Sequence, residues 1–287
     1  MAIVTDLDHV GVGVRDLAAA ARTYERLGFT LSPFARHAGA VEPGGPIVAR
    51  ATGNRCAMLG AGYLELIAIV DPKLPAGGMD ARIAAREGVH IAAFGCADAK
   101  AADAHLRAAN FASRGGVYLE RMVDSPEGPM MAKFDRVPVA PHETPEGAVF
   151  YIKHLTREAI WQKQLLNHAN GSLALDEAVF HVADADEAAL RYGRFLGLAA
   201  TGAGGVRRIA LPRGTLTLAD SRGLRGLLPF ADVAPAPGIV GVTVRTRSLD
   251  EVRRTLEAAR VPAVAEGKRL LVAPAHAHGC ALTFAAD

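Results

Sequence analysis

The chain has 287 residues, enough for one large domain or two domains of ordinary size. Half of the residues are hydrophobic and 22% are charged, a composition typical of globular proteins with sizeable cores rather than of disordered chains. The formal net charge is only +2 and its lysines and arginines are spread along the chain, so nothing indicates nucleic-acid or membrane-surface partners.

The first predicted element is a half-buried strand at residues 7–14, where apolar residues alternate with period two. Valines occupy one face, and His9 shares the other face with Gly11 and Gly13. Because glycine has no side chain, that face has a hollow beside the imidazole, suited to a metal, a ligand or a closely approaching backbone. On this segment alone, a strand-end histidine with tolerated glycines is the favoured interpretation.

An alanine-rich helix is predicted at residues 17–27, with Asp16 as its N-cap and Gly28 as its stop. Three strands follow, at 29–33, 54–59 and 62–69. Glu65 lies inside the last, otherwise apolar strand, where a buried carboxylate is costly unless it is paired or bound to a metal. An exposed strand face is the alternative explanation.

The same order of elements then recurs. A strand at 89–95 carries His90 near its start, a second alanine-rich helix covers 99–109, and further strands are predicted at 117–121, 130–134 and 148–155. His9 and His90 are 81 positions apart (90 − 9), at places that match in two copies of one strand–helix–three-strand unit.

Two more units follow a connecting segment. The third begins with a strand at 175–182, and the fourth with a strand at 238–244. Each continues into an amphipathic helix and further strands. The four units therefore pair as two halves.

The three cysteines are far apart and form no CxxC motif, as expected for reduced thiols. The N-terminus has no basic region followed by an apolar run, and no segment is long enough to span a membrane. We therefore expect a cytoplasmic protein.

The order of these units, with Leu7-Asp8-His9-Val10, Gly53-Asn54-Arg55 and Tyr63-Leu64-Glu65-Leu66-Ile67, resembles the vicinal oxygen chelate (VOC) superfamily, in particular its glyoxalase-like domains. The resemblance implies an α+β fold of paired βαβββ modules that form two glyoxalase/dioxygenase-like half-barrel domains. The first domain would cover 1–157, with modules at about 5–72 and 86–157. A connector at 158–174 and a C-terminal domain at 175–287 would follow.

In this superfamily a metal is held by the first and last strands of both modules, which implies His9, Glu65 and His90 as ligands here. The usual glutamate of the second module is missing: spacing alone indicates Tyr151, whereas His154 is the better ligand chemically and is the fourth ligand that we expect. In this superfamily the sheets of two modules curl around a cup that holds the metal. Tyr151 and His154 have opposite parity along a strand, so both point into that cup only if the strand is bulged. Imidazole and carboxylate ligands suit Zn, Fe, Mn, Co or Ni, and the sequence does not separate these ions.

The C-terminal half departs further from the family pattern. Its first strands have Glu177 and Gly241 where histidines are expected, which argues against an extradiol dioxygenase with its iron in that half. In the N-terminal half, Arg55 and Asn54 are candidates for binding substrate, with Tyr151 as a third. His37 could line the mouth of the cup, although a solvated loop histidine is the favoured interpretation.

These features predict a metal-dependent glyoxalase-like enzyme, an isomerase, lyase or oxygenase, acting on a small metabolite with vicinal oxygens. Glu65 would serve as ligand or base. The alternative is a metal-free protein that binds or sequesters a small molecule, like the bleomycin-resistance members; a scaffold with vestigial ligand positions is a third. Paired modules permit a monomer, and a homodimer is equally compatible with the family.

Overall fold

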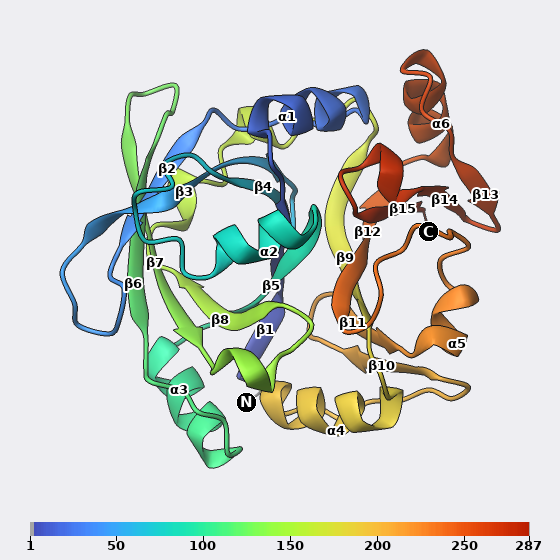
Figure 1. The fold of residues 1–287 in the computed structure, drawn as a ribbon. Helices are drawn as coiled ribbons and strands as arrows, with labels where there is room; N and C mark the ends of the chain where they lie inside the picture. Colours follow the sequence, from blue (N-terminus) through green and yellow to red (C-terminus); the bar gives the residue numbers. More distant parts are fainter. Residues whose placement is uncertain (1–2, 287) are drawn as a thin grey trace.

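The computed structural model describes residues 3–286 and contains two β-sheets with helices packed outside them (Figure 1). The α+β class and the paired modules are confirmed. The extreme residues of the two predicted domains, 1–2 and 287, lie outside the described chain.

The N-terminal half is a closed barrel with strand order β1-β4-β3-β2-β6-β7-β8-β5. The β1–β5 and β2–β6 pairs, both antiparallel, join its two modules. Its elements are β1 (Val4–Gly13), α1 (Leu17–Arg26), β2 (Ala35–Gly39), β3 (Val48–Met58), β4 (Tyr63–Ile69), α2 (Met79–Ala85), β5 (Gly88–Cys96), α3 (Ala99–Ala108), β6 (Val117–Val123), β7 (Met130–Pro138), η1 (Pro141–Glu143) and β8 (Ala148–His154). The side chain of Asp16 caps α1, as predicted, and that of Asp98 caps α3 in the same way.

The C-terminal half is an open, seven-stranded sheet with order β10-β11-β9-β12-β15-β14-β13. The elements after the barrel are η2 (Arg157–Ala159), η3 (Lys163–Leu165), β9 (Ser172–His181), α4 (Ala185–Leu196), β10 (Val206–Ala210), β11 (Thr215–Ala219), α5 (Ser221–Arg225), β12 (Gly238–Thr246), α6 (Leu249–Ala258), β13 (Val264–Glu266), β14 (Arg269–Val272), η4 (Pro274–His276) and β15 (Ala281–Ala285). Its first module has only two strands after the helix, so this sheet does not close.

Strand alternation sorts the barrel side chains into two groups. Val10, Val12 and Val14 join a large core under the helices, which continues without a break into the C-terminal half. Residues of the opposite parity, such as Ile91 and Phe150, form a second cluster inside the barrel. The interior cluster surrounds the pocket described below.

The strand predicted at 29–33 does not form. Ser32 makes one backbone hydrogen bond to the carbonyl of Cys56, but Pro33 has no N–H to continue a ladder, and β2 begins only at Ala35. The three cysteines are buried free thiols. Within residues 3–286, no helix has the length and apolarity needed to cross a membrane.

Candidate functional site

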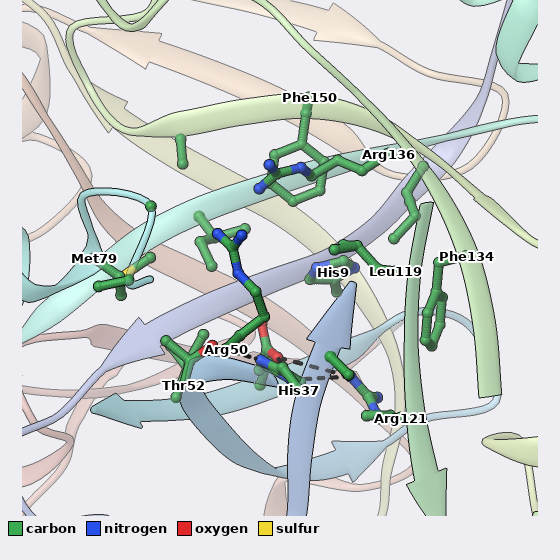
Figure 2. Close-up of a pocket in the computed structure, with 18 of the residues that line it drawn as sticks. His9, His37, Arg50, Thr52, Met79, Leu119, Arg121, Phe134, Arg136 and Phe150 are labelled. Carbon is green, nitrogen blue, oxygen red and sulfur yellow. Dashed lines mark hydrogen bonds and ion pairs between the residues drawn. The ribbon is translucent and has the colours of Figure 1, made fainter. Parts of the chain in front are cut away.

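A pocket of about 130 Å³ lies inside the N-terminal barrel (Figure 2). Both modules contribute to its walls, through interior-facing residues of all eight barrel strands and through α2. Its titratable and charged lining residues are His9, His37, Arg50, Glu65, Arg82, Glu120, Arg121 and Arg136. The pocket is therefore polar and rich in arginine.

Glu65 reaches this interior from β4, directly beside Gly11 of β1 in the parallel register. A Cβ at Gly11 would lie 3.2 Å from Oε2 of Glu65 and 2.8 Å from Cδ1 of Ile91. The hollow predicted beside His9 is therefore real, and it is filled by a carboxylate from one module and an isoleucine from the other.

The Glu65 carboxylate is held on one side only. Asn54 donates to Oε1 at 2.5 Å, and Nη1 of Arg121 lies 4.0 Å from the same atom. Burial by itself raises the pKa of Glu65, but nearby basic side chains and the Asn54 hydrogen bond outweigh it and lower that pKa. Among the hydrogen bonds of residues 3–286, none involves Oε2. Glu65 is thus ionised at neutral pH with one oxygen unengaged.

His37 lies on β2 and lines the pocket, so its interpretation as a solvated loop histidine is wrong. Its Nδ1 is 2.8 Å from the Thr52 hydroxyl, and Arg121 donates to its Nε2 at 3.4 Å. Burial lowers the pKa of His37 to about 4, against an opposing effect of Glu65. The ring is therefore neutral at pH 7, with its proton on Nδ1 directed to Thr52.

Asp8 is a buried carboxylate that positions His9. One oxygen lies 2.7 Å from Nδ1 of His9, and both oxygens lie 3.0 Å from Nε2 of His154. Burial opposes ionisation of Asp8, but the two histidines outweigh it and hold its pKa well below the usual range. His9 also stacks on Tyr63, with ring centroids 4.4 Å apart. These contacts leave Nε2 as the ring nitrogen of His9 available to a ligand.

His154 and Tyr151, the two alternatives for a fourth ligand, both lie outside the pocket lining. His154 packs edge-on against Phe134 and Trp161, and its Nδ1 is buried without a hydrogen-bond partner. Tyr151 has the opposite parity and enters the outer core, where its hydroxyl donates to the Phe195 carbonyl. The structure therefore places neither of these two alternative ligands in the pocket lining.

His90 also lies outside the pocket lining. Its Nε2 is 3.0 Å from the carbonyl oxygen of Arg86, and a Cβ at Gly13 would lie 2.7 Å from its ring. Burial lowers the pKa of His90 to about 4. The imidazole therefore packs as a neutral side chain between β1 and the end of α2.

The registers explain this displacement. The helix N-caps Asp16 and Asp98 are 82 positions apart (98 − 16), so the counterpart of His9 is Ile91 rather than His90. His90 instead corresponds to Asp8. Both residues are skipped in the β1–β5 register, at equivalent irregularities of the two strands.

The counterpart of Glu65 follows from the same symmetry. Gly11 lies opposite Glu65 in the β1–β4 pair, and its equivalent Ala93 lies opposite Phe150 in the β5–β8 pair. The four positions that would surround a metal are therefore held by His9, Glu65, Ile91 and Phe150, of which only the first two are ligands. Within residues 3–286, no three His, Cys, Asp or Glu side chains form a metal-binding group. The residues present do not fit a divalent ion.

Comparison with known proteins agrees with this architecture. A sequence model described as a glyoxalase-like domain matches residues 7–196, well over half of the chain. This chain belongs to the glyoxalase-like domain family. The resemblance to the VOC superfamily is thereby confirmed. A search of curated proteins gives no match.

Solved structures resemble the whole chain, at low sequence identity. A hypothetical protein from Staphylococcus aureus has a TM-score of 0.66 and 10% identity, covering 98% of this chain and 99% of its own. A mutant of 4-hydroxymandelate synthase from Streptomyces coelicolor has a TM-score of 0.56 and 12% identity, covering 100% and 93%. A catechol 2,3-dioxygenase has a TM-score of 0.50 and 13% identity, covering 100% and 89%. These TM-scores establish a shared fold.

The two remaining candidates of this glyoxalase-like domain lie outside the pocket lining. Asn54 acts on Glu65 through the hydrogen bond described above. Arg55, of opposite parity, faces outward, where it donates to the Ser32 carbonyl at 2.9 Å and pairs with Glu25 at 3.1 Å.

The sequence interpretation missed the pocket arginines and the role of Asp8. Parity could have identified Arg136, because it shares a strand face with Phe134, and both side chains enter the barrel. Asp8 carried no such signal. Both faces of β1 are buried from Asp6 to Gly13, so alternation does not single it out.

Proposed function

We propose that the pocket of the N-terminal barrel is the active site of a glyoxalase-like enzyme that transfers a proton on a small, oxygen-rich metabolite without a resident metal ion. The observation that supports this most directly is Glu65, an ionised buried carboxylate with one oxygen unengaged and facing the cup. Isomerase or lyase chemistry next to a carbonyl requires such a base.

In this proposal Glu65 removes a proton from the carbon beside the substrate carbonyl. Negative charge then develops on the carbonyl oxygen, and the buried guanidinium of Arg121 lies beside Glu65 and His37 to stabilise it. His9, oriented by Asp8, exchanges a proton with a neighbouring substrate oxygen through Nε2. Returning the Glu65 proton to the adjacent carbon completes an isomerisation.

The metal-dependent version expected from the family would need a third ligand that the cup does not offer. A metal-free binding protein is the second candidate, favoured by the aromatic walls of the pocket, Tyr63, Phe134 and Phe150. The net positive lining disfavours a cationic ligand for such a protein. Binding without turnover would identify this second function.

The test is solvent-deuterium exchange followed by NMR, with a panel of 2-hydroxy ketones, 2-hydroxy acids and 2-oxo acids that first raise the melting temperature. We expect exchange at the carbon beside the carbonyl, insensitive to EDTA and reduced about 10²–10⁴-fold in Glu65→Gln. Elemental analysis of untagged protein should find far less than one divalent ion per chain. Exchange that survives Glu65→Gln, or that EDTA abolishes, would overturn the proposal.

A further inference from the structure

Of the four arginines that line the pocket, only Arg121 lies near a carboxylate, and two of the others, Arg50 and Arg136, also have a buried nitrogen without a partner among residues 3–286. Arg50 enters from β3 and Arg136 from β7, and Figure 2 shows Arg50 extending across the cup towards Arg136. Within residues 3–286, neither pairs with a carboxylate. Nη1 of Arg50 and Nε of Arg136 are buried without a hydrogen-bond partner.

Such an arrangement is unfavourable for the empty protein. A buried guanidinium is costly unless an anion or a set of acceptors compensates its lost hydration. Here Arg136 only lies over the ring of Phe150, with its Cζ 5.3 Å from the centroid. Burial, and then the charge of Arg50, lower the pKa of Arg136 to about 10. Each charged arginine therefore raises the free-energy cost of burying the other one.

The acidic groups of the pocket do not remove this excess charge. Four arginines line it, against two carboxylates, Glu65 and Glu120. Glu65 is engaged by Asn54 and Arg121, and Glu120 accepts from the hydroxyl of Tyr118 at 2.9 Å. Counting only these arginines and carboxylates, the lining has a net charge of +2.

We propose that Arg50 and Arg136 form an anion subsite that binds the carboxylate or phosphate group of the substrate. This inference rests on the proposed function, since it names the substrate class of the same pocket. Planar guanidinium groups bind either anion through paired N–H donors. A cavity of about 130 Å³ limits the ligand to a small molecule, since an engineered cavity of about 150 Å³ holds benzene.

The subsite also orients the ligand. Arg50 and Thr52 share one face of β3, Thr52 contacts His37, and His37 lies 3.5 Å from Oε1 of Glu65. An anion held by the two arginines thus lies along the same row of side chains as the base. The reacting carbon would be the one next to, or one removed from, the anionic group.

The experiment titrates the 287-residue protein with glycolate, inorganic phosphate and neutral ethylene glycol at low salt, by calorimetry and thermal shift. We expect at least one anion to bind and the neutral diol not to bind; the two anions separate a carboxylate from a phosphate site. Arg50→Gln and Arg136→Gln should each weaken anion binding about 10- to 100-fold. Arg55→Gln, on the same strand but outside the pocket, should change it less than twofold.

The stability of the unliganded variants gives an independent readout. Because each substitution removes an uncompensated, partly buried charge, neither glutamine variant should melt below the wild type. If Arg136→Gln fails to fold, the anion affinity of Arg50→Gln alone tests the subsite. Unchanged anion affinity in a folded Arg50→Gln or Arg136→Gln protein, or no binding of either anion, would overturn the subsite.

The outcome is separable from that of the proposed function. Glu65→Gln should retain anion affinity within about threefold while exchange is lost. Arginine-dependent anion binding with no exchange by the wild type would overturn the proposed function and leave the subsite standing. Exchange of neutral substrates with no dependence on Arg50 or Arg136 would support the proposed function and overturn the subsite.

Discussion

Two buried carboxylates organise the pocket at the scale of single residues, and they differ in how far sequence could identify them. Glu65 was identifiable because a charged side chain within an apolar strand is costly without a partner. Its partners come from three other strands, Asn54 from β3, His37 from β2 and Arg121 from β6, so only the closed barrel shows them. Asp8 sits next to His9 in sequence, yet its role depends on His154, 146 positions away.

Asp8→Asn tests this carboxylate. Losing a buried charge that serves two histidines should lower the free energy of unfolding at pH 7 by roughly 1–3 kcal/mol. Because the pKa of Asp8 is lowered in the folded state, its contribution is present above about pH 4 and lost as the pH falls further. Urea titrations should therefore show the difference between the two proteins shrinking steadily as the pH falls below about 4. Asp16→Asn, at the exposed α1 N-cap, is the matched control and should change stability by a few tenths of a kcal/mol.

His90 contributes to the pH dependence in the same direction as Asp8, but over a higher pH range. Its folded-state pKa of about 4 lies below the ordinary value, so the unfolded chain binds its proton first as the pH falls. Wild-type stability should thus decline between about pH 6.5 and pH 4, by on the order of 3 kcal/mol from this residue. His90→Gln should flatten this part of the urea-determined stability profile, and His142→Gln, at an exposed site, should not. If stability declined between pH 6.5 and pH 4 as much in His90→Gln as in the wild type, the assignment of His90 as a buried, neutral side chain would be wrong.

At the scale of elements, register decides which residues share the cup. The strand–helix–three-strand modules follow from hydrophobic alternation and from caps such as Asp16, both of which are local signals. The one-residue difference between an 81- and an 82-residue repeat decides between His90 and Ile91 as the counterpart of His9, and the spacing of the caps Asp16 and Asp98 supports 82. In the β1–β5 register, the equivalent residues Asp8 and His90 are both skipped, which leaves Ile91 in the cup and His90 outside it.

The register predicts a gain of function. Ile91→His combined with Phe150→Glu should complete a two-histidine, two-carboxylate cup and bind close to one divalent ion per chain, measured by elemental analysis and zinc or cobalt titration. The wild type should bind far less. The control combines the same residue types at two other lining positions, Ile152→His and Phe134→Glu. Equal uptake by the two double variants, both folded by circular dichroism, would contradict the assigned symmetry.

For the molecule as a whole, the two halves share buried polar contacts as well as a core. Glu146, between β7 and β8, is 3% exposed and pairs with Arg191 of α4 at 2.8 Å. It also accepts from the hydroxyl of Tyr192 at 2.6 Å. Close by, Tyr151 donates to a carbonyl of the same helix. In Figure 1, α4 accordingly lies beside the barrel end where β1 starts, although it belongs to the second sheet.

Glu146→Ala should therefore destabilise both halves together. It leaves a partly buried guanidinium and a buried hydroxyl without their shared acceptor, which should cost about 2–4 kcal/mol. Trp161 fluorescence and hydrogen exchange of the β9–β15 peptides should report one common transition. Glu187→Ala removes the exposed partner of Arg191 and should cost less than 1 kcal/mol. Separate transitions in the wild type would contradict this coupling.

The sequence by itself determined the modules, their order, the superfamily, and two pocket side chains, His9 and Glu65. These depend on local periodicity, helix caps and the cost of a charge in an apolar strand, all of which a few neighbouring residues express. Only the tertiary structure decided the rest: Ile91 and Phe150 in place of ligands, Asp8 behind His9, and Arg50 facing Arg136. Those relations join residues far apart in the chain, and they depend on strand registers and barrel closure, which the alternation of a single strand does not specify.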